Sequence, residues 1–527
     1  MNSETASAAP GSTAPQTVLR LQGITKRFGG LTANDAISLT LHRGEIVALL
    51  GENGAGKSTL MSILFGHYVA DEGSIEVFGQ PLPPGQPRAA LAAGIGMVHQ
   101  HFALADNLSV LDNIMAGGTS LASLKLDTAG ARQKLLDVAQ QFGLVVNPDA
   151  KVGTLTVGER QRVEILKALY RGARILILDE PTAVLTPAES EALFDTLGQM
   201  VAQGLSIIFI SHKLGEVLRV SNRVAVLRHG KLVAEAATAD CTQGKLAQWM
   251  VGHAITLPER RPAKNVGASV CSLRHVDSAA VKGKDSRDQL KNISLELKAG
   301  EIVAIAGVSG NGQVALADVL CGVRPVTGGQ LTYLGQPLPK SPIALVAQGI
   351  ARIPEDRHGT GVVGDLPVWE NAVSERLHTK WFSRFGWIKR KAAQRYAEHV
   401  SKTFDVRGGG LHAPARSLSG GNMQKLILGR AMLPPTVDGQ QADAPRLIVA
   451  HQPTWGLDIG AVQFVQQQLI AARDAGAAVL VISDDLDEVL ALGDRIAVMH
   501  EGTLTEAKPH ADWSRETIGM AMAGAGA

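Results

Sequence analysis

The segment IVALLGENGAGKS, residues 46–58, is the most informative part of this 527-residue chain. It starts with an apolar, β-branched run at 46–50, continues through the glycine-rich loop GENGAGKS at 51–58, and leads into a helix-forming run at 59–65. The loop matches the phosphate-loop pattern completely, in the strand–loop–helix context that the pattern requires. Glycines let backbone N–H groups wrap phosphates, and the N-terminus of the helix adds a favourable dipole. The segment therefore predicts a phosphate-binding loop in an α/β fold.

Two polar side chains end this loop, and two acidic ones follow a later strand. Lys57 would pair with the outer phosphates, and Ser58 would offer its hydroxyl to Mg²⁺. Asp179 and Glu180 come directly after the apolar run 175–178. In a doubly wound sheet, the carboxyl ends of the strands open into the ligand crevice. We expect Asp179 to hold the Mg²⁺ shell through water and Glu180 to polarise the attacking water.

The chain contains this arrangement twice. Residues 37–51 (ISLTLHRGEIVALLG) and 293–307 (ISLELKAGEIVAIAG) are identical at ten of fifteen positions, at a constant offset of 256. A period this long indicates a duplicated domain rather than a solenoid. In each copy, apolar runs alternate with helix-like segments, which predicts an α/β layout with a largely parallel, buried sheet. We place a polar tail at 1–16, a first domain at 17–252, a linker at 253–268 and a second domain at 269–527.

Composition argues against several other classes of protein. The chain has 45% hydrophobic and 19% charged residues, and a net charge of only +2 offers no large electrostatic footprint for nucleic acid. Its three cysteines have no paired spacing, so neither a disulfide framework nor a zinc site is indicated. We expect no membrane-spanning helix and no signal peptide. If the protein acts at a membrane, a partner must bring it there.

Further motifs resemble those of the ABC ATPases. The segments LTVGERQ (155–161) and LSGGNMQ (418–424) are similar to the signature motif of that family. Gln100 matches its Q-loop, His212 matches its switch histidine, and Phe28 stands where the family places an aromatic that stacks on adenine. The resemblance covers essentially the whole chain. It implies two tandem P-loop NTPase domains, each with a mainly parallel sheet core, an antiparallel β subdomain and a helical signature subdomain.

The resemblance also implies that the two cassettes pair head-to-tail, with each ATP between one half's phosphate loop and the other half's signature. In the first pocket every part of the family pattern is present, and the one departure is Asn422, where the family often has Gln. The expected catalytic residues are Glu180, His212 and Gln100. The expected ATP-binding residues are Gly51, Glu52, Asn53, Gly54, Ala55, Gly56, Lys57, Ser58, Thr59, Phe28, Ser419, Gly420, Gly421 and Asp458. The expected Mg²⁺ ligands are Ser58, Asp179 and Gln100.

The second pocket departs from the family pattern in both of its contributors. The replacements are Gln313 at the phosphate lysine, Val314 at the Mg²⁺ hydroxyl, His451 and Gln452 at the acidic pair, Glu355 at the Q-loop, Asp484 at the switch histidine, and Thr156, Val157 and Thr186 in the opposing signature and D-loop. Loss of the lysine alone removes a contact worth roughly 1.5–3 kcal/mol. We expect this pocket to hydrolyse ATP negligibly and to bind nucleotide at most weakly through its glycine loop.

Tandem cassettes, a short linker and a degenerate second half resemble the importer ATPases for simple sugars and nucleosides. Three segments, 96–114, 157–187 and 353–363, are similar to the nucleoside branch, which we favour. The resemblance implies two integral membrane permease subunits, an extracytoplasmic binding protein, a peripheral position on the cytoplasmic face of the cell membrane, and no nucleic acid. Short permease helices would insert near Gln100 and Glu355.

The main alternative is a tandem-cassette translation factor that acts on ribosomes. Such proteins usually keep both pockets intact and carry a long charged linker, and this chain has neither. Repair and chromosome ATPases carry zinc modules or coiled coils, which are also not seen. The segment WFSRFGWIKRKAAQRY (381–396) could contact lipid or nucleic acid. We favour a place in the second helical subdomain, with Trp381, Phe385 and Ile388 on one face of a helix.

Overall fold

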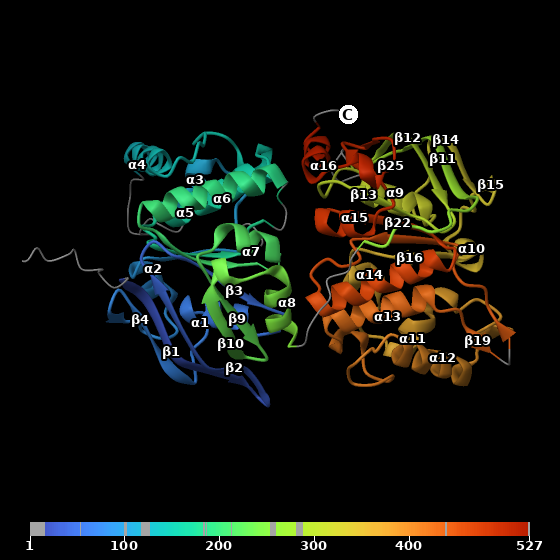
Figure 1. Ribbon diagram of the computed structural model, residues 1–527, viewed down its shortest axis with the longest axis horizontal. Coiled ribbons are helices and arrows are strands. Elements are labelled where there is room, and N and C mark those ends of the chain that lie inside the picture. Colours follow the sequence, from blue (N-terminus) through green and yellow to red (C-terminus); the bar gives the residue numbers. More distant parts are fainter. Residues whose placement is uncertain are drawn as a thin grey trace, which may run out of the picture. The chain divides into compact units, whose positions relative to one another are not determined.

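Both phosphate-loop segments connect a buried strand to a helix, as the sequence predicts. The protein is described here by a computed structural model, which covers residues 16–52, 54–99, 103–116, 127–182, 185, 187–211, 213–252, 260–280, 288–437 and 440–524. The chain divides into two units, residues 1–185 with 189–255, and residues 256–527 with 186–188. Figure 1 shows that each unit combines sheets with covering helices.

The first unit is built on a six-stranded sheet. All six residues of β3 (Ile46–Gly51) are buried, and β3 lies between parallel neighbours in the order β10-β9-β3-β8-β7-β6. Only the edge strand β10 runs antiparallel to its neighbour. Burial on both faces explains why the central strands are continuous apolar runs. The other strands are β6 (Ile95–Val98), β7 (Ile175–Asp179), β8 (Ser206–Ile210), β9 (Arg223–Arg228) and β10 (Lys231–Ala237).

A second, antiparallel sheet in this unit has the order β2-β1-β4-β5. Its apolar residues share one hydrophobic core with β3 and the helix that follows the phosphate loop. Its strands are β1 (Thr17–Phe28), β2 (Leu31–His42), β4 (Glu72–Val77) and β5 (Gln80–Pro81). The helices are α1 (Lys57–Leu64), α2 (Pro87–Ala92), α3 (Val110–Met115), α4 (Thr128–Gln141), α5 (Val157–Tyr170), α6 (Pro187–Ala202), α7 (Leu214–Val220) and α8 (Gln243–Val251).

The second unit repeats this plan. Its main sheet has the order β16-β21-β22-β13-β23-β24, with β25 on β23, and its antiparallel sheet has the order β12-β11-β14-β15. The strands are β11 (Ser269–Ser278), β12 (Leu290–Lys298), β13 (Ile302–Ala306), β14 (Gly328–Tyr333), β15 (Gln336–Pro337), β16 (Ile350–Ile353), β21 (Leu447–His451), β22 (Ala478–Ser483), β23 (Arg495–His500), β24 (Thr503–Leu504) and β25 (Lys508–Pro509). The helices are α9 (Gln313–Leu320), α10 (Pro342–Ala347), α11 (Val368–Val373), α12 (Arg390–Thr403), α13 (Gly420–Met432), α14 (Ile459–Asp474), α15 (Leu486–Leu492) and α16 (Arg515–Met522). The predicted α/β class, with parallel cores and antiparallel subdomains, is confirmed.

The prediction of a helical face with Trp381, Phe385 and Ile388 is wrong. The chain forms a hairpin of β17 (Ser383–Arg384) and β18 (Trp387–Ile388), and α12 starts only at Arg390. The two central residues of the turn, Phe385 and Gly386, have φ values of 51° and 83°. Positive φ at both positions matches the right-handed twist of a two-residue hairpin. The ring of Phe385 is therefore left 89% exposed.

A further hairpin, β19 (Thr436–Val437) with β20 (Gln440–Gln441), lies between α13 and β21. In the first unit, α5 and β7 are separated by only four residues, 171–174. The hairpin is thus an addition to the repeated plan. Among the described residues, no helix has the length and apolar character needed to cross a lipid bilayer.

Candidate nucleotide site

The backbone of the loop between β3 and α1 has a shape that requires glycine. Gly54 and Gly56 have φ values of 83° and 100°. A Cβ on Gly56 would lie 2.3 Å from the carbonyl oxygen of Ala33. The buried Asn34 donates from Nδ2 to the Gly56 carbonyl at 3.0 Å, which fixes the loop on β2. No side chain caps α1, so its first N–H groups are suited to binding an anion.

The structure brings Lys57 together with Asp179, the last residue of β7, and with Glu180, which follows it. Lys57 Nζ donates to the carbonyl oxygens of Gly51 at 2.6 Å and Glu52 at 3.1 Å. Burial lowers the pKa of Lys57, and the charges of Glu180 and Asp179 oppose this effect. Burial also raises the pKa of Asp179, an effect that Glu180 increases and Lys57 reduces. All three charges therefore act on one another at the edge of the sheet where the sequence places the site.

A divalent cation suits this excess of negative charge. Two neighbouring carboxylates disfavour each other's ionisation, and a cation beside them removes that penalty. The described residues contain no group of three or more His, Cys, Asp or Glu side chains suited to a metal. Mg²⁺ needs no such group, because it is usually bound by one or two carboxylates, waters and substrate phosphates. The predicted ligands Ser58 and Asp179 are compatible with this mode.

Glu180 has a backbone conformation that is unusual for a residue other than glycine. Its φ is 48°, and its N–H donates to the Ile210 carbonyl at 2.9 Å. Its counterpart in the second unit, Gln452, has a φ of 47°. Such conformations cost on the order of 1–3 kcal/mol and cluster at functional sites. The backbone turn that follows β7 in the first unit is thus repeated after β21 in the second unit. The side chain at this position is Glu180 in the first unit and Gln452 in the second.

Glu216, on α7, was not predicted from the sequence. Its Oε2 atom accepts hydrogen bonds from Thr182 Oγ1 at 2.6 Å and from Ser211 Oγ at 3.0 Å. It therefore ties the segment after β7 to the segment that leads to His212. The repeat contains a signal that could have found it, because FISHKLGEVL and VISDDLDEVL align Glu216 with Glu488. Three predicted site residues, Asn53, Gln100 and His212, lie outside the described part of the chain.

Two exposed aromatic rings lie beside each other in the first unit. The rings of Phe28 and Tyr68 are 43% and 45% exposed, and their centroids are 5.5 Å apart in an edge-on arrangement. Lys26 Nζ lies 5.4 Å from the centroid of Phe28. Exposed aromatic faces are suited to stacking on a nucleobase. Tyr68 was not predicted, since it follows α1 and lies far from Phe28 in the sequence.

In the second unit, the signature and the D-loop meet. Ser419 is the N-cap of α13, and its hydroxyl accepts the N–H of Asn422 at 3.4 Å. A Cβ on Gly421 would lie 3.7 Å from Oδ2 of Asp458. Asp458 caps α14 by accepting the N–H of Ala461 at 2.8 Å. The structure therefore brings together the four ATP-binding residues predicted in this half.

The signature helix of the first unit has a different first turn. Thr156 and Glu159 form a capping box on α5, in which Glu159 Oε2 accepts the Thr156 N–H at 2.8 Å. A carboxylate thus stands where the second unit has the neutral Asn422. Negative charge at a helix N-terminus satisfies the N–H groups that an anion would otherwise bind.

The phosphate loop of the second unit is filled by its own side chains. Gln313, only 3% exposed, donates from Nε2 to the Val308 carbonyl at 2.7 Å and accepts the Asn311 N–H at 2.8 Å. It takes the place of Lys57 without a charge. Asp288 Oδ1 accepts the Ala315 N–H in the first turn of α9, at 3.1 Å. At the repeat offset of 256, the first half has Thr32 at the position of Asp288.

His451, which replaces Asp179, is a neutral imidazole. It is 6% exposed, and burial, with a smaller effect from Arg352, lowers its pKa to about 4. Its Nε2 lies 3.6 Å from Oε2 of Glu355, too far for a hydrogen bond. Burial and the charge of Asp484 raise the pKa of Glu355. The position that would coordinate Mg²⁺ therefore offers no negative charge.

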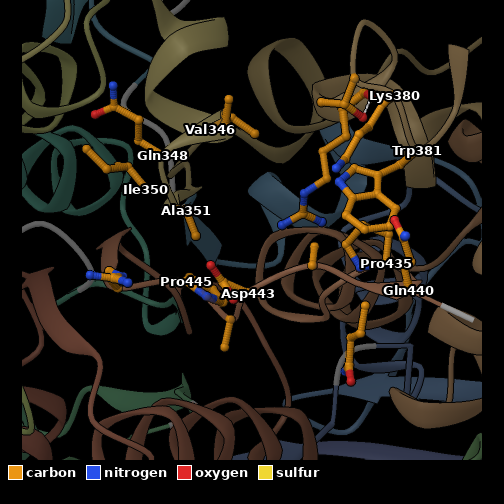
Figure 2. A pocket seen from close by; sticks show the side chains of 18 of the residues that line it. Val346, Gln348, Ile350, Ala351, Lys380, Trp381, Pro435, Gln440, Asp443 and Pro445 are labelled. Carbon is orange, nitrogen blue, oxygen red and sulfur yellow. Dashed lines mark hydrogen bonds between the residues drawn. The ribbon is translucent and has the colours of Figure 1, made fainter. Parts of the chain in front are cut away.

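A separate cavity of about 810 Å³ lies in the second unit (Figure 2). Its lining includes Ile350, Lys380, Trp381, Pro435 and Gln440. Ile350 is the first residue of β16, whereas the loop position Glu355 follows the other end of that strand. In open α/β sheets, ligands bind at the carboxyl ends of the strands. The cavity is therefore distinct from the nucleotide site.

A parallel sheet with a lysine-bearing phosphate loop defines a P-loop nucleotide-binding ATPase. Comparison with known proteins gives the family, since the ABC transporter profile matches residues 34–183 and 290–436. The chain belongs to this family and is an ATP-binding cassette ATPase with two cassettes.

Relatives of similar length match almost the whole chain. A nucleoside import ATP-binding protein of Lactococcus lactis is 41% identical over 97% of this chain and 99% of its own length. A guanosine import ATP-binding protein of Bacillus subtilis is 42% identical over 96% of this chain and 97% of its own. A glucose import ATP-binding protein of Haloferax volcanii is also 42% identical, over 96% of each chain.

A solved complex of an archaeal ribosome recycling factor with a ribosomal stalk protein is similar in structure, with a TM-score of 0.60 over 96% of this chain and 92% of that chain. The sequence identity is 18%, so this likeness shows the fold alone.

The buried imidazole gives a prediction for the pH dependence of stability. His451 has a pKa of about 4 in the fold and 6.5 as its ordinary value, so its contribution is full above pH 6.5 and is lost as the pH falls toward 4. Between pH 7.5 and 5.0, the wild type should lose about 2 kcal/mol of unfolding free energy that His451→Gln retains. Urea unfolding at both pH values measures this. The exposed His412→Gln is the control, and equal losses in wild type and His451→Gln would contradict the prediction.

Proposed function

We propose that this chain is the ATP-hydrolysing subunit of an importer for nucleosides or simple sugars, with nucleosides favoured. The proposal includes two integral membrane permease subunits and an extracytoplasmic substrate-binding protein, with the chain held at the cytoplasmic face of the cell membrane. The relatives named for nucleoside, guanosine and glucose import support import as the activity. The nucleoside preference rests on the segments 96–114, 157–187 and 353–363, which resemble that branch.

The observation that carries the proposal is that each unit keeps one of the two family motifs intact. The first unit keeps the phosphate loop, and the second keeps the signature. The first unit has Lys57 beside two carboxylates, and the second has a signature helix whose first turn is neutral and is capped by the Ser419 hydroxyl. The other two contributors are altered, since Gln313 fills one loop and Glu159 caps the other signature. Head-to-tail pairing of the cassettes would combine both intact parts in one pocket and both altered parts in the other. We infer one working ATP site.

In the proposed cycle, ATP binds the first loop and favours closure of the two cassettes, which shifts the permeases. Ser58, Asp179 and Gln100 would hold Mg²⁺, which when bound neutralises charge on the phosphates. Glu180 would accept a proton from the attacking water, and His212 would contact the terminal phosphate. Hydrolysis would remove the ligand that stabilises the closed state. One ATP would be consumed in each cycle.

Paired substitutions at equivalent positions test the single working site. Lys57→Ala should reduce ATP turnover by roughly 100-fold or more, because it removes the cation that would stabilise the phosphates. Gln313→Ala should change turnover by less than about twofold, because Gln313 makes only neutral contacts within its own loop. Steady-state phosphate release by the reconstituted transporter measures both. Turnover that survives Lys57→Ala would refute the assignment.

Purification from the native cell tests the import role. The tagged chain, gently solubilised, should bring down two multi-span membrane proteins. With the loaded binding protein present, nucleosides should stimulate ATP hydrolysis by that complex and simple sugars should not. Ribosomal subunits with no membrane partner would instead support the translation-factor alternative. Stimulation by sugars alone would support the import role and contradict the preference for nucleosides.

A further inference from the structure

The second unit contains an arginine that lies between the signature and the D-loop. Arg357 follows β16 and starts a short π-helical turn, Arg357–Gly361. Asp356 caps this turn by accepting the N–H groups of His358 at 3.0 Å and Gly359 at 2.8 Å. The turn packs closely on α13, since a Cβ on Gly361 would lie 2.6 Å from Cδ1 of Ile427. These contacts hold Arg357 in a defined place.

The guanidinium of Arg357 reaches the predicted phosphate-binding glycine of the signature. A Cβ on Gly420 would lie 3.2 Å from Nη1 of Arg357, and a Cβ on Gly456 would lie 3.9 Å from Nη2. Gly456 is part of the D-loop, two residues before Asp458. Arg357 therefore stands beside the N-terminus of α13, where Ser419, Gly420 and Gly421 meet Asp458.

Within the described part of the chain Arg357 forms no ion pair, whereas the other three buried arginines each do. Arg324 pairs with Asp288 at 2.7 Å, Arg430 with Glu375 at 2.8 Å, and Arg473 with Asp494 at 3.3 Å. Arg357 is 8% exposed, and its Nη2 has no hydrogen-bond partner among the described residues. Burial lowers its pKa. A buried cation without a partner is costly, which points to an anion that joins it in the working protein.

An arginine is present at this position only in the second unit, which has the intact signature motif. The strands 95–98 and 350–353 align at an offset of 255, and this alignment places Phe102 opposite Arg357. The first unit thus has an apolar residue in the sequence at this position and a carboxylate, Glu159, on its signature helix. The second unit has a cation and the neutral Asn422. The difference in charge favours anion binding at α13 over α5.

We infer that Arg357 binds the terminal phosphate of the ATP held by the first loop, together with the first turn of α13. Arginine and a phosphate can form two parallel charge-assisted hydrogen bonds, which a lysine cannot reproduce. The inference rests on the proposed pairing of the first loop with the second signature, and it adds a residue to that pocket. ADP lacks the phosphate in question, so Arg357 makes the pocket select ATP over ADP.

Binding of Mg-ATP and Mg-ADP to the full-length chain tests this inference. Arg357→Gln should weaken ATP binding by roughly 10- to 100-fold and change ADP binding by less than about twofold. Arg357→Lys should fall between, because it keeps the charge and loses the paired geometry, and it serves as the test if Arg357→Gln does not fold. Titration calorimetry gives both dissociation constants, and thermal unfolding monitors the fold.

Arg407→Gln is the matched control, because it also removes one positive charge near α13, from an exposed side chain paired with Asp405. It should leave the ratio of ATP to ADP affinity unchanged. Lys57→Ala, which should abolish binding of both nucleotides, tests the proposed pocket separately. The inference on Arg357 is overturned if Lys57→Ala abolishes binding while Arg357→Gln weakens ATP and ADP equally or weakens neither.

Discussion

The electrostatic balance between the partly buried Lys57 and the carboxylates of Asp179 and Glu180 is the basis of the site in the first unit. Partial burial lowers the pKa of Lys57 and raises that of Asp179, and the opposite charge of each group reduces the shift of the other. The sheet makes this balance possible, because it places the end of β7 near the loop that follows β3. Phosphates and Mg²⁺ would add charges of both signs to an arrangement that already has both.

The second unit keeps the backbone of this arrangement and changes its charges. Gly54 and Gly310 have φ values of 83° and 88°, Gly56 and Gly312 of 100° and 109°, and the strained Glu180 and Gln452 of 48° and 47°. These conformations connect strands to helices over a shared core, so the fold needs them with or without catalysis. The fold does not require particular side chains at the catalytic positions. In the second unit, Gln313 stands in place of the lysine, and His451 and Gln452 stand in place of the acidic pair. Backbone and chemistry are therefore separable in this protein.

The sequence predicted what depends on local patterns. Continuous apolar runs gave the buried parallel strands, and the phosphate loop gave the place of Lys57 between β3 and α1. It missed Asp288, Tyr68, Glu216 and Arg357, because each of these matters through a contact with a residue distant in the sequence. The prediction of a helix through Phe385 and Ile388 is wrong because apolar spacing does not distinguish this hairpin from a helix, whereas Gly386 indicates a turn. The catalytic and metal-binding roles of the predicted residues stay predictions.

The charges of the second pocket argue against even the weak nucleotide binding that its glycine loop alone would allow. ATP carries several negative charges, and its binding relies on cations and free N–H groups. At that loop Asp288, which is paired with Arg324, accepts an N–H of the first turn of α9. The charge of Asp484 raises the pKa of Glu355. The pocket thus has a neutral amide in place of the lysine cation, and one N–H of its first helical turn is already occupied by Asp288. We therefore propose that the second loop serves as a structural connection, and that the second unit would contribute to ATP binding through α13.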